Sequence, residues 1–508
     1  MVKFFYYNHK KTMKIIEELR LRATELTNLN NILALLHWDQ EVMMPTGGAA
    51  GRAAQFSVLS TIVHQKICDP RLGELLQELA GRPSELSDGD QALVRVLKRE
   101  YDKNTKLPEK FVADFARLTS EALPVWVNAR KQNDFKQFLP LLQRIITMCR
   151  KKADFLGYGH HPYDALLDLY EEGLTTKNLD ALFGSLQSEL RNLLQHQFYQ
   201  ERTLPVSLGN IPSMQPQEQV RFSERLLAEI GYDFNRGRQD ISAHPFTTSL
   251  GHNDRRVTNR FRHDSIEFIF SALHEGGHAL YEQNISAEYS DTPLDEGVSL
   301  GIHESQSRLW ENIIGRSRLF WDKYYPMLQE FLPHPFKAVA LDDFVHYINR
   351  VHPGMIRVEA DEVTYNLHVL IRFELEKGLI EGTVAASDLP PLWNEKYMNY
   401  LGVKVDSDAN GALQDIHWAH GSFGYFPTYT IGNLAAAQIW HSYCLYDPGY
   451  KQTLQQGNLT KIRTWLTKNI YCHGGLYPPA ELLQRICGEA LNANYFIEYL
   501  KSKPEFSR

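Results

Sequence analysis

Two histidines and a glutamate stand together in residues 271–280, which read SALHEGGHAL. His274 and His278 are four residues apart, so on an α-helix both imidazoles lie on one face and can bind the same metal ion. Neutral imidazole nitrogens are ligands that suit Zn²⁺. Glu275 follows the first histidine, and its carboxylate can reach a water molecule at the ion and accept a proton. The pattern H-E-x-x-H therefore predicts metal-assisted hydrolysis, most often of a peptide bond.

The surrounding residues predict that this pattern lies within a packed helix. Asp264 or Ser265 can act as the N-cap of that helix. Apolar residues then recur at helical spacing; they are Ile266, Ile269, Phe270 and Leu273. Two unpaired imidazoles would be costly to bury in such a segment, so a metal site is favoured over a solvated face. Gly276 and Gly277 weaken the helix, and we expect them to clear space beside the metal for a substrate.

A catalytic zinc site needs a third protein ligand and one open position. No further histidine or aspartate stands at the short spacing of metzincin-type sites, so a glutamate is the expected ligand. The downstream candidates are Glu282, Glu288, Glu296, Glu304 and Glu311. Residues 296–310 predict a second helix, and a loop around residues 290–293 can turn the chain back toward the first one. Spacing alone leaves both Glu304 and Glu296 open.

Several separated segments extend this pattern over nearly the whole chain. In order, they are HPF at 244–246, DRRVT at 254–258, HEGGH at 274–278, HESQ at 303–306, IRVEAD at 356–361 and GALQDIHW at 411–418. An N-terminal segment, LHWDQEVMMP at 36–45, adds to them. Together these segments resemble the carboxypeptidase Taq family of thermostable metallocarboxypeptidases. The glycines inside HEGGH are a variant of the family pattern, and they leave the chemistry intact.

The resemblance implies both a site and an activity. It implies that His274, His278 and Glu304 bind the metal and that Glu275 is the catalytic base. The expected metal is Zn²⁺, with Co²⁺ or Mn²⁺ as substitutes. The resemblance further implies a homodimer that releases single C-terminal residues, tolerates many side chains and acts poorly where proline stands at the cleavage position.

A carboxypeptidase must hold the free α-carboxylate of its substrate. Arginine suits this task because its planar guanidinium binds a carboxylate through two hydrogen bonds. Arg357 could instead pair with Asp361, four residues later on a helix, but the resemblance favours it as the anchor. Arg256 is a second substrate-binding candidate, with a structural pair to Asp254 as the alternative. His244 precedes a proline and so belongs to extended or loop backbone, which fits a wall of the cleft.

An aromatic segment near the C-terminus, residues 417–429, holds candidates for stabilising an oxyanion. A tyrosine hydroxyl or a histidine N–H aimed at the scissile carbonyl oxygen would stabilise the negative charge that develops there. His417, Tyr425 and Tyr429 are residues of these types. Core packing is the commoner role of an aromatic-rich loop. Similarity to other long-cleft zinc peptidases favours catalytic roles for His417 and Tyr425, and Tyr429 remains a substrate-binding candidate.

Composition excludes several other classes of protein. The chain has 508 residues, of which 43% are hydrophobic and 23% charged, and its formal net charge is -7. These values predict a globular protein with a large core and no basic stripe for nucleic acid. The five cysteines lack C-x-x-C spacing and indicate free thiols in a reducing compartment. No apolar run is long enough to span a membrane and no signal peptide is evident, so we expect a cytoplasmic protein.

Apolar periodicity predicts a mainly α protein with the large helical long-cleft zinc peptidase fold. Helical spacing extends over residues 12–66 and returns in residues 71–79, 91–103, 111–132 and 176–200. The pattern breaks around residues 234–258, where we expect a small β-sheet at the edge of the active-site cleft. We expect one metallocarboxypeptidase domain over residues 1–508. Its N-terminal helical half, residues 13–205, could act as a lid over the catalytic half, residues 206–508.

Two other functions stay open at this point. An oligopeptidase or dipeptidyl carboxypeptidase on the same fold would share the metal site and differ in the length of the cleft. A catalytically silent peptide-binding scaffold is disfavoured, because it would be free to lose one of the metal ligands. The sequence therefore predicts a zinc metallocarboxypeptidase that acts on peptides with a free C-terminus and uses Glu275 as general base.

Overall fold

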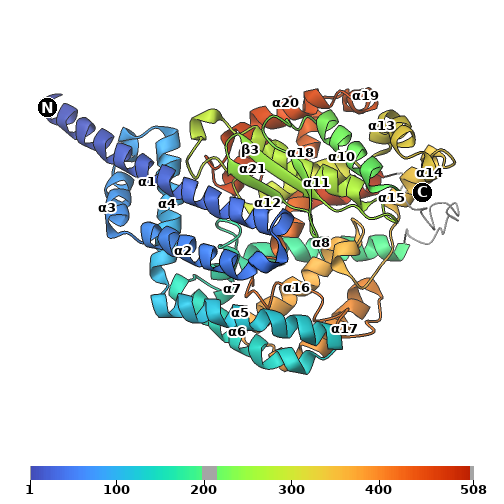
Figure 1. Ribbon diagram of the computed structural model, residues 1–508, viewed down its shortest axis with the longest axis horizontal. Coiled ribbons are helices and arrows are strands. Elements are labelled where there is room, and N and C mark those ends of the chain that lie inside the picture. The colour runs from blue at the N-terminus through green and yellow to red at the C-terminus, as the bar shows by residue number, and fades with distance from the viewer. Residues whose placement is uncertain (1, 197–213, 504–508) are drawn as a thin grey trace.

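The computed structural model describes residues 2–196 and 214–503, and Figure 1 shows a mainly helical molecule with one small sheet. The helices of the N-terminal part are α1 (Val2–Val42), α2 (Ala49–Ile67), α3 (Pro70–Ala80), α4 (Asp88–Lys106), α5 (Glu109–Gln132), α6 (Phe135–Leu156), α7 (Pro162–Leu167) and α8 (Thr176–His196). The predicted helix over residues 176–200 is present up to His196, and its last residues lie outside the described part. The predicted boundary between the two halves, near residue 205, also lies outside it.

The helices of the C-terminal part are α10 (Pro216–Ile230), α11 (Glu267–Gln283), α12 (Leu300–Arg308), α13 (Arg318–Phe331), α14 (Pro333–Phe336), α15 (Leu341–Asn349), α16 (Thr364–Glu381), α17 (Leu389–Leu401), α18 (Pro427–Tyr446), α19 (Tyr450–Gln455), α20 (Leu459–Asn469), α21 (Pro479–Cys487) and α22 (Asn494–Ser502). A π-helix, η4 (Leu309–Ile314), continues α12. Short 3₁₀ turns complete the chain: η1 (Thr46–Gly48), η2 (Pro83–Glu85), η3 (Ala287–Tyr289), η5 (Arg357–Glu359), η6 (Ala386–Asp388) and η7 (Tyr471–His473).

The small sheet lies where the helical period breaks in the sequence. Its strands are β1 (Gln239–Ile241), β2 (Thr247–Gly251) and β3 (Asp254–Asn259), in the order β1-β3-β2. Val257 of the central strand stands opposite Gln239 of β1 in parallel and opposite Thr247 of β2 in antiparallel register. The sheet contacts α11 on one side, and its β2 strand contacts α1. The prediction of a mainly α fold with a small sheet is confirmed.

Helices α16 and α18 are buried along most of their length. Their buried residues are spread around the circumference, so they lack the one-sided pattern of a surface helix and pack against neighbours on every side. Helix α18 packs on α12, and α11 packs on both α12 and the sheet. This arrangement places α11 and α12, which carry the candidate metal ligands, inside the core of the C-terminal part.

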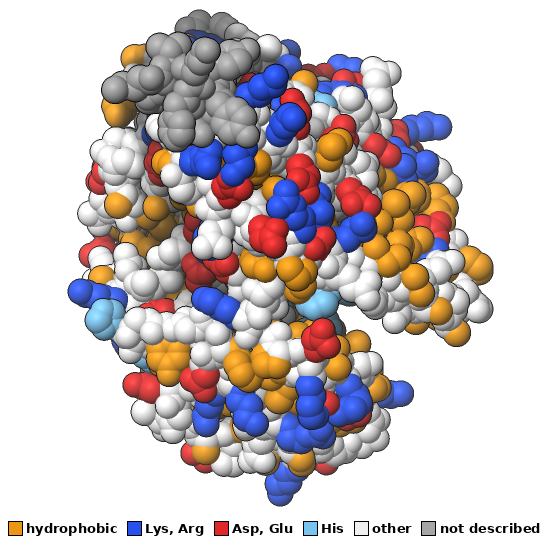
Figure 2. All heavy atoms as spheres, turned by 90° about the vertical axis from the view of Figure 1, so that its left-hand side faces the viewer, with side chains coloured by type: hydrophobic (Ala, Val, Ile, Leu, Met, Phe, Trp, Pro, Cys, Tyr) orange, Lys and Arg blue, Asp and Glu red, His pale blue; other side chains and the backbone are white. Residues whose placement is uncertain are grey.

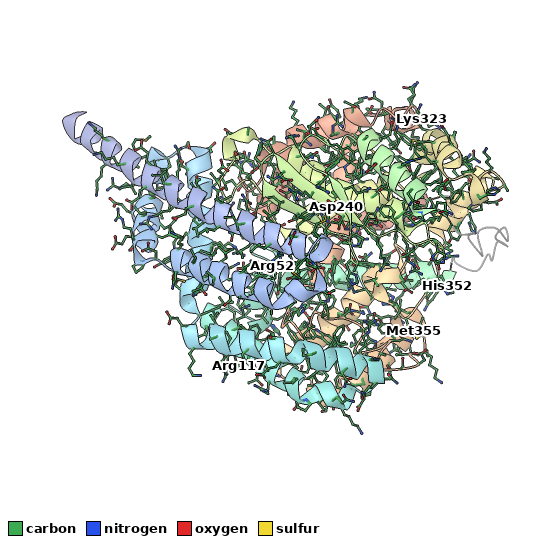
Figure 3. The ribbon with its side chains drawn as sticks, in the orientation of Figure 1. Arg52, Arg117, Asp240, Lys323, His352 and Met355 are labelled. Atoms are coloured by element: carbon green, nitrogen blue, oxygen red, sulfur yellow. The ribbon has the colours of Figure 1, made fainter. Side chains whose placement is uncertain are left out.

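Two long helices, α1 and α2, lie side by side at the N-terminal side, and the first residues of α1 extend beyond the rest of the molecule (Figure 1). Arg52 of α2 forms an ion pair with Asp39 of α1 at 2.5 Å, and Figure 3 shows Arg52 between the two helices. The far end of α1 reaches the sheet, where the rings of His37 and Phe246 lie 5.7 Å apart. The N-terminal half therefore touches the region of the HPF motif.

Within residues 2–196 and 214–503, no helix combines the length and the hydrophobicity that a membrane span requires. On the face shown in Figure 2, acidic and basic side chains are interspersed.

Candidate metal centre and active site

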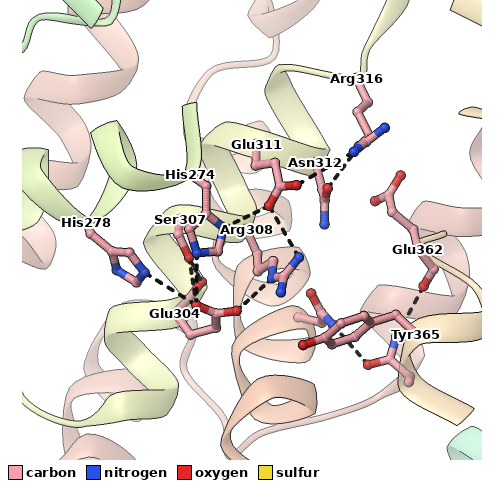
Figure 4. A network of polar contacts seen from close by, with 12 residues as sticks. His274, His278, Glu304, Ser307, Arg308, Glu311, Asn312, Arg316, Glu362 and Tyr365 are labelled. Carbon is pink, nitrogen blue, oxygen red and sulfur yellow. Dashed lines mark hydrogen bonds and ion pairs between the residues drawn. The ribbon is translucent and has the colours of Figure 1, made fainter. Parts of the chain in front are cut away.

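Helix α11 brings the two histidines of the H-E-x-x-H pattern together. The helix begins at Glu267, later than predicted, and the Ser265 hydroxyl accepts a hydrogen bond from the Glu267 N–H at 3.1 Å. His274 and His278 lie one turn apart, and their rings meet edge to face with centroids 4.9 Å apart. Both imidazoles point to the same side of the helix (Figure 4).

Glu304 of α12 completes a group of three metal-binding side chains. Ser299 caps this helix by accepting a hydrogen bond from the Ile302 N–H at 3.2 Å, so the helix begins after Glu296 and not at it. Oε2 of Glu304 lies 3.5 Å from Nε2 of His274 and 3.4 Å from Nε2 of His278. The three candidate ligand atoms lie within 4.8 Å of one another. Of the two glutamates that spacing left open, the geometry favours Glu304.

The group has the donor set that a catalytic zinc-class ion requires. Oε1 of Glu304 accepts a hydrogen bond from Nε of Arg308 at 2.7 Å, and the Ser307 hydroxyl donates to Oε2 at 3.0 Å. The remaining lone pair of Oε2 faces the two imidazole nitrogens. Two nitrogen atoms and one carboxylate oxygen match the three protein ligands of such sites, with a further position for water or substrate. The residues present therefore fit a divalent metal ion.

Glu311 lies behind His274, although the sequence left it among the candidate ligands. It belongs to the π-helix η4, and such wide turns are frequent at functional sites. Its Oε2 lies 2.8 Å from Nδ1 of His274 and 3.2 Å from Nη1 of Arg308. Arg316 lies 3.6 Å from the other oxygen. Contacts of this kind orient a ligating histidine and fix which of its nitrogens carries the proton.

Without a metal, Glu304 and His278 favour the protonation states of metal ligands, whereas His274 favours its protonated form. Burial raises the pKa of Glu304, but Arg308 and His274 outweigh burial and hold the pKa well below the usual range. Burial and the neighbouring His303 lower the pKa of His278 to about 3. Burial also lowers the pKa of His274, but the carboxylates of Glu304 and Glu311 reverse this and raise it to about 9. A cation that binds here would displace that proton.

Glu275 lies between the metal group and the sheet. The Thr247 hydroxyl donates a hydrogen bond to its Oε2 at 2.7 Å, and Thr247 belongs to strand β2. Burial raises the pKa of Glu275 above the ordinary value for glutamate. A carboxylate with a raised pKa is a stronger base, which suits proton transfer near neutral pH.

The expected role of Gly276 and Gly277 was wrong. A Cβ atom on Gly277 would stand 2.6 Å from the carbonyl oxygen of Gln306, and one on Gly276 would stand 2.6 Å from a side-chain carbon of Ile230. These glycines therefore face α12 and α10, and they do not clear space for a substrate. Gly277 lets α11 and α12 approach closely, which brings Glu304 to the histidines, and Gly276 lets α10 pack against α11.

A large cavity opens beside the metal group. It has a volume of about 1060 Å³, and His274 and Glu275 line it. His244, Arg357 and Tyr429, three of the predicted substrate-binding residues, line the same cavity. Another part of its wall comes from the connection between α15 and η5, where Figure 3 labels His352 and Met355. His244 and Pro245 of the HPF motif therefore lie at a cleft wall, the position expected for His244.

Arg357 is held by partners that the sequence did not indicate. It stands at the start of the 3₁₀ turn η5, where its Nε and Nη2 donate to Oδ1 of Asp415 at 3.1 and 2.8 Å. Its Nη1 donates to the Tyr365 hydroxyl at 3.1 Å, and the residue is 5% exposed. The alternative pair with Asp361 was wrong, because Asp361 instead accepts hydrogen bonds from the first turn of α16.

Two further arginines differ in whether their guanidinium groups already have a carboxylate partner. Arg256 donates to both oxygens of Asp254 at 2.8 Å, which is the structural pair considered above, and its guanidinium covers the ring of Trp38 at 4.2 Å. Arg350 was missed from the sequence because it lies just outside a recognised motif. It is exposed, lines the cavity and stacks over Tyr347 at 4.5 Å.

The aromatic candidates form one cluster. Nε2 of His417 lies 3.4 Å from the Tyr429 hydroxyl, and the Tyr425 and Tyr429 rings are 5.3 Å apart. Burial lowers the pKa of His417 to about 3, so its imidazole is neutral. Burial also raises the pKa of Tyr425, which keeps its O–H available as a donor. The cluster therefore holds neutral donors of the kind that stabilise an oxyanion, and of its three members only Tyr429 is among the residues that line the cavity.

These features define the class of helical metallopeptidases. They are a helical scaffold, a buried H-E-x-x-H pair, a glutamate from the following α-helix and an adjoining cleft. The family model described as carboxypeptidase Taq (M32) metallopeptidase matches residues 18–504. The chain therefore belongs to the carboxypeptidase Taq family, a family of peptide hydrolases. This confirms the resemblance read from the motifs.

Known relatives cover almost the whole chain. It is 41% identical over 481 residues to carboxypeptidase 1 of Bacillus subtilis, covering 94% of this chain and 95% of the relative. It is 38% identical over 498 residues to thermostable carboxypeptidase 1 of Pyrococcus furiosus, covering 96% and 98%. Among solved structures, the M32 carboxypeptidase of Deinococcus radiodurans superposes with a TM-score of 0.94 at 36% identity, covering 97% of this chain and all of that one (100%).

Proposed function

We propose that the chain is a zinc-dependent carboxypeptidase that releases single residues from the C-termini of peptides with broad specificity. The observation that carries this proposal is the group of His274, His278 and Glu304, which lies beside Glu275 at a cleft. Family membership supports the reaction class. The alternative metals Co²⁺ and Mn²⁺ have similar ligand preferences, and metal analysis of the purified protein distinguishes them.

The side chains have separate tasks in the proposed reaction. When bound, a zinc-class ion would polarise the scissile carbonyl and lower the pKa of a water molecule. Glu275 accepts a proton from the attacking water at Oε1, because Oε2 already accepts from Thr247, and it later donates a proton to the leaving amine. His417 and Tyr425 donate hydrogen bonds to the carbonyl oxygen as it becomes negative.

Substrate binding is assigned to the walls of the cleft. Arg357 holds the terminal carboxylate, since the residue lines the cavity and its guanidinium stays charged at every working pH. His244 and Tyr429, which line the same cavity, contact the rest of the peptide. Arg256 is paired with Asp254 and is not among the residues that line this cavity, so its structural role is favoured over the predicted contact with substrate. We further infer a homodimer, which the family resemblance supports. A cytoplasmic location agrees with the five free cysteines at positions 68, 149, 444, 472 and 487.

The test uses a series of peptides with free or amidated C-termini, purified protein with added zinc, and mass spectrometry of the products. A carboxypeptidase shortens the free acids one residue at a time and cleaves the amides at least about tenfold more slowly, because a charge-assisted pair is lost. Release of dipeptides would indicate a dipeptidyl carboxypeptidase, and internal cleavage of both series an oligopeptidase. Binding of peptides without any cleavage would indicate the silent scaffold.

A further inference from the structure

A buried carboxylate that the proposed mechanism does not use lies behind the aromatic cluster. Glu376 of α16 has 0% exposure. Its Oε1 accepts a hydrogen bond from the indole N–H of Trp418 at 2.8 Å. Its Oε2 accepts from the Tyr163 hydroxyl at 2.5 Å and from the Gly424 N–H at 2.9 Å. Two of these donors belong to residues 417–425, the segment that carries the proposed oxyanion-stabilising groups.

The same segment lies tightly against the N-terminal half. Gly424 has a φ of +93°, and a Cβ atom there would stand 2.7 Å from the carbonyl oxygen of Leu166 in α7. Tyr170, which follows α7, meets Tyr425 edge to face at 5.2 Å. Tyr163, the hydroxyl donor to Glu376, also belongs to α7. The back of the segment is therefore fixed by contacts with α7 and by the carboxylate of Glu376.

A chain of contacts joins the segment to the proposed metal ligands, and it begins where Nε2 of His417 lies 3.4 Å from the Tyr429 hydroxyl. The Tyr365 and Tyr429 rings are 6.1 Å apart, and the guanidinium of Arg308 covers the Tyr365 ring at 4.8 Å. Arg308 in turn holds Glu304. A displacement of residues 417–425 would therefore move His417 relative to the proposed metal ligands.

We propose that Glu376 is a positioning residue for the hydrolysis. Its carboxylate accepts two hydrogen bonds from the segment and one from α7. These bonds fix the positions of His417 and Tyr425 relative to the scissile carbonyl. The inference rests on the proposed function, because positioning has an effect only if these two residues act on a substrate. Removal of the Glu376 carboxylate would destabilise this arrangement, because the N–H groups of Trp418 and Gly424 would then stay buried without a hydrogen-bond acceptor.

Glu376→Gln is the sharpest variant because it keeps the size of the side chain. Glutamine offers one oxygen in place of two, so in either rotamer its NH₂ faces the N–H of Trp418 or of Gly424, and one donor of the segment loses its acceptor. We expect kcat to fall by about ten- to a hundredfold, the scale of a small misplacement of a catalytic group. KM and bound zinc should stay within about twofold of the parent, because substrate and metal binding are left in place.

Tyr163→Phe provides a second variant if Glu376→Gln does not fold. It removes one donor to the carboxylate and should lower kcat severalfold with unchanged KM. The matched control is Tyr443→Phe, which removes a hydroxyl that donates to Asp447 at 3.1 Å at the other end of α18. That control should leave kcat unchanged.

A double-mutant cycle separates positioning from a general loss of stability. If Glu376 acts through His417 and Tyr425, Glu376→Gln should have little further effect on kcat in a background that carries both His417→Ala and Tyr425→Phe. Equal fold losses in both backgrounds, or an unchanged kcat in Glu376→Gln, would overturn the inference. A parent enzyme that cleaves no peptide would instead overturn the proposed function, so the two failures are distinct.

Discussion

The Nδ1 atom of His274 lies 2.8 Å from Oε2 of Glu311, while its Nε2 faces Glu304. Once His274 is neutral, this contact keeps the proton on Nδ1 and leaves Nε2 free to bind a metal. Arg308 contacts both carboxylates, Glu304 at 2.7 Å and Glu311 at 3.2 Å. A candidate ligand, its orienting carboxylate and the arginine between them therefore form one unit (Figure 4).

This unit predicts that Glu311→Gln weakens metal binding without removing a ligand. Glutamine keeps the shape but loses the charge that supports His274 and balances Arg308 and Arg316. The affinity for zinc should fall by about 10- to 100-fold, the usual effect of changing such an orienting partner. Competition with a chromophoric chelator measures it. Glu330→Gln, at an exposed position of α13, is the control, and an unchanged affinity in Glu311→Gln would contradict the assignment.

The contact between α11 and α12 predicts the effect of Gly277→Ala. The new methyl group would stand 2.6 Å from the Gln306 carbonyl oxygen and 2.8 Å from Cα of Ser307, both of which are backbone atoms. The helices must separate, which should cost about 1–3 kcal/mol of unfolding free energy and also reduce zinc retention. Chemical denaturation and metal analysis measure the two effects. Gly51→Ala on α2, where nothing lies within 4 Å, should be neutral or stabilising.

Local patterns in the sequence were sufficient for the metal pair and the fold class. The spacing of His274 and His278 is a property of any helix, and the break in helical period marks the sheet. Spacing alone left Glu304 and Glu296 open, because the choice depends on where Ser299 caps the second helix, and only the family resemblance favoured Glu304. The role of Gly277 was misjudged for a similar reason, since spacing cannot show which helix lies opposite.

The remaining differences between the sequence-based predictions and the structure come from side-chain partners that are far apart in the sequence. The partner of Arg357 is Asp415, which lies 58 residues away, and no local pattern joins them. Glu376 was also missed, although a signal existed. It stands among apolar residues of α16, where a charged side chain must find partners inside the protein. The catalytic and binding roles of the site residues stay predictions until they are measured.

Substitutions at two glutamates distinguish the base from the ligand. Glu275→Gln keeps the volume of the side chain but cannot accept the proton of water, so activity should fall by several orders of magnitude while zinc binding persists. Glu304→Gln should instead weaken zinc retention, because Oε2 is the proposed donor. Zinc content and peptide hydrolysis are measured on both variants. The opposite pattern would remove Glu304 from the ligand set.

His274→Ala extends this test to the histidines. It removes one nitrogen donor, so the protein should lose both bound metal and activity. Dialysis against a chelator should abolish the activity of the parent, and added zinc should restore it. A His274→Ala protein that keeps stoichiometric zinc and full activity would contradict the site assignment.

Glu171 predicts a pH dependence of stability. It accepts hydrogen bonds from the Ser299 hydroxyl at 2.8 Å and from the Gly301 N–H at 2.9 Å, at the start of α12. Burial raises its pKa to about 7, although both hydrogen bonds oppose this. Because the unfolded pKa is about 4.3, the folded protein binds this proton more tightly. The resulting stability is fully present below about pH 4.3 and is lost as the pH rises to about 7.

Glu171→Gln removes this titration and measures its size. The unfolding free energy of the parent minus that of the variant should fall by up to about 1.4 kcal/mol per pH unit across this window and stay constant above it. Urea denaturation between about pH 5 and 8, in the presence of chelator, provides the values. A difference that does not change with pH would show that Glu171 keeps one protonation state throughout.

The residue that holds the terminal carboxylate can be identified by selectivity between free-acid and amidated peptides. Arg357 is the proposed anchor, yet three of its N–H groups already donate to Asp415 and Tyr365. Arg350 is exposed in the same cavity and provides the direct comparison. A lysine cannot reproduce the paired hydrogen bonds of a guanidinium, so the variant at the anchor should lose most of a discrimination that is at least about tenfold in the parent.

Selectivity is a better measure here than rate. Arg357→Lys also disturbs the buried pair with Asp415, and this alone could lower the rate for acid and amide alike. The ratio of kcat/KM values for the two peptides cancels such a common loss. A ratio that collapses in Arg357→Lys and persists in Arg350→Lys would support Arg357 as the anchor. The reverse result would move the anchor to Arg350 and leave Arg357 as the residue that fixes η5 against Asp415.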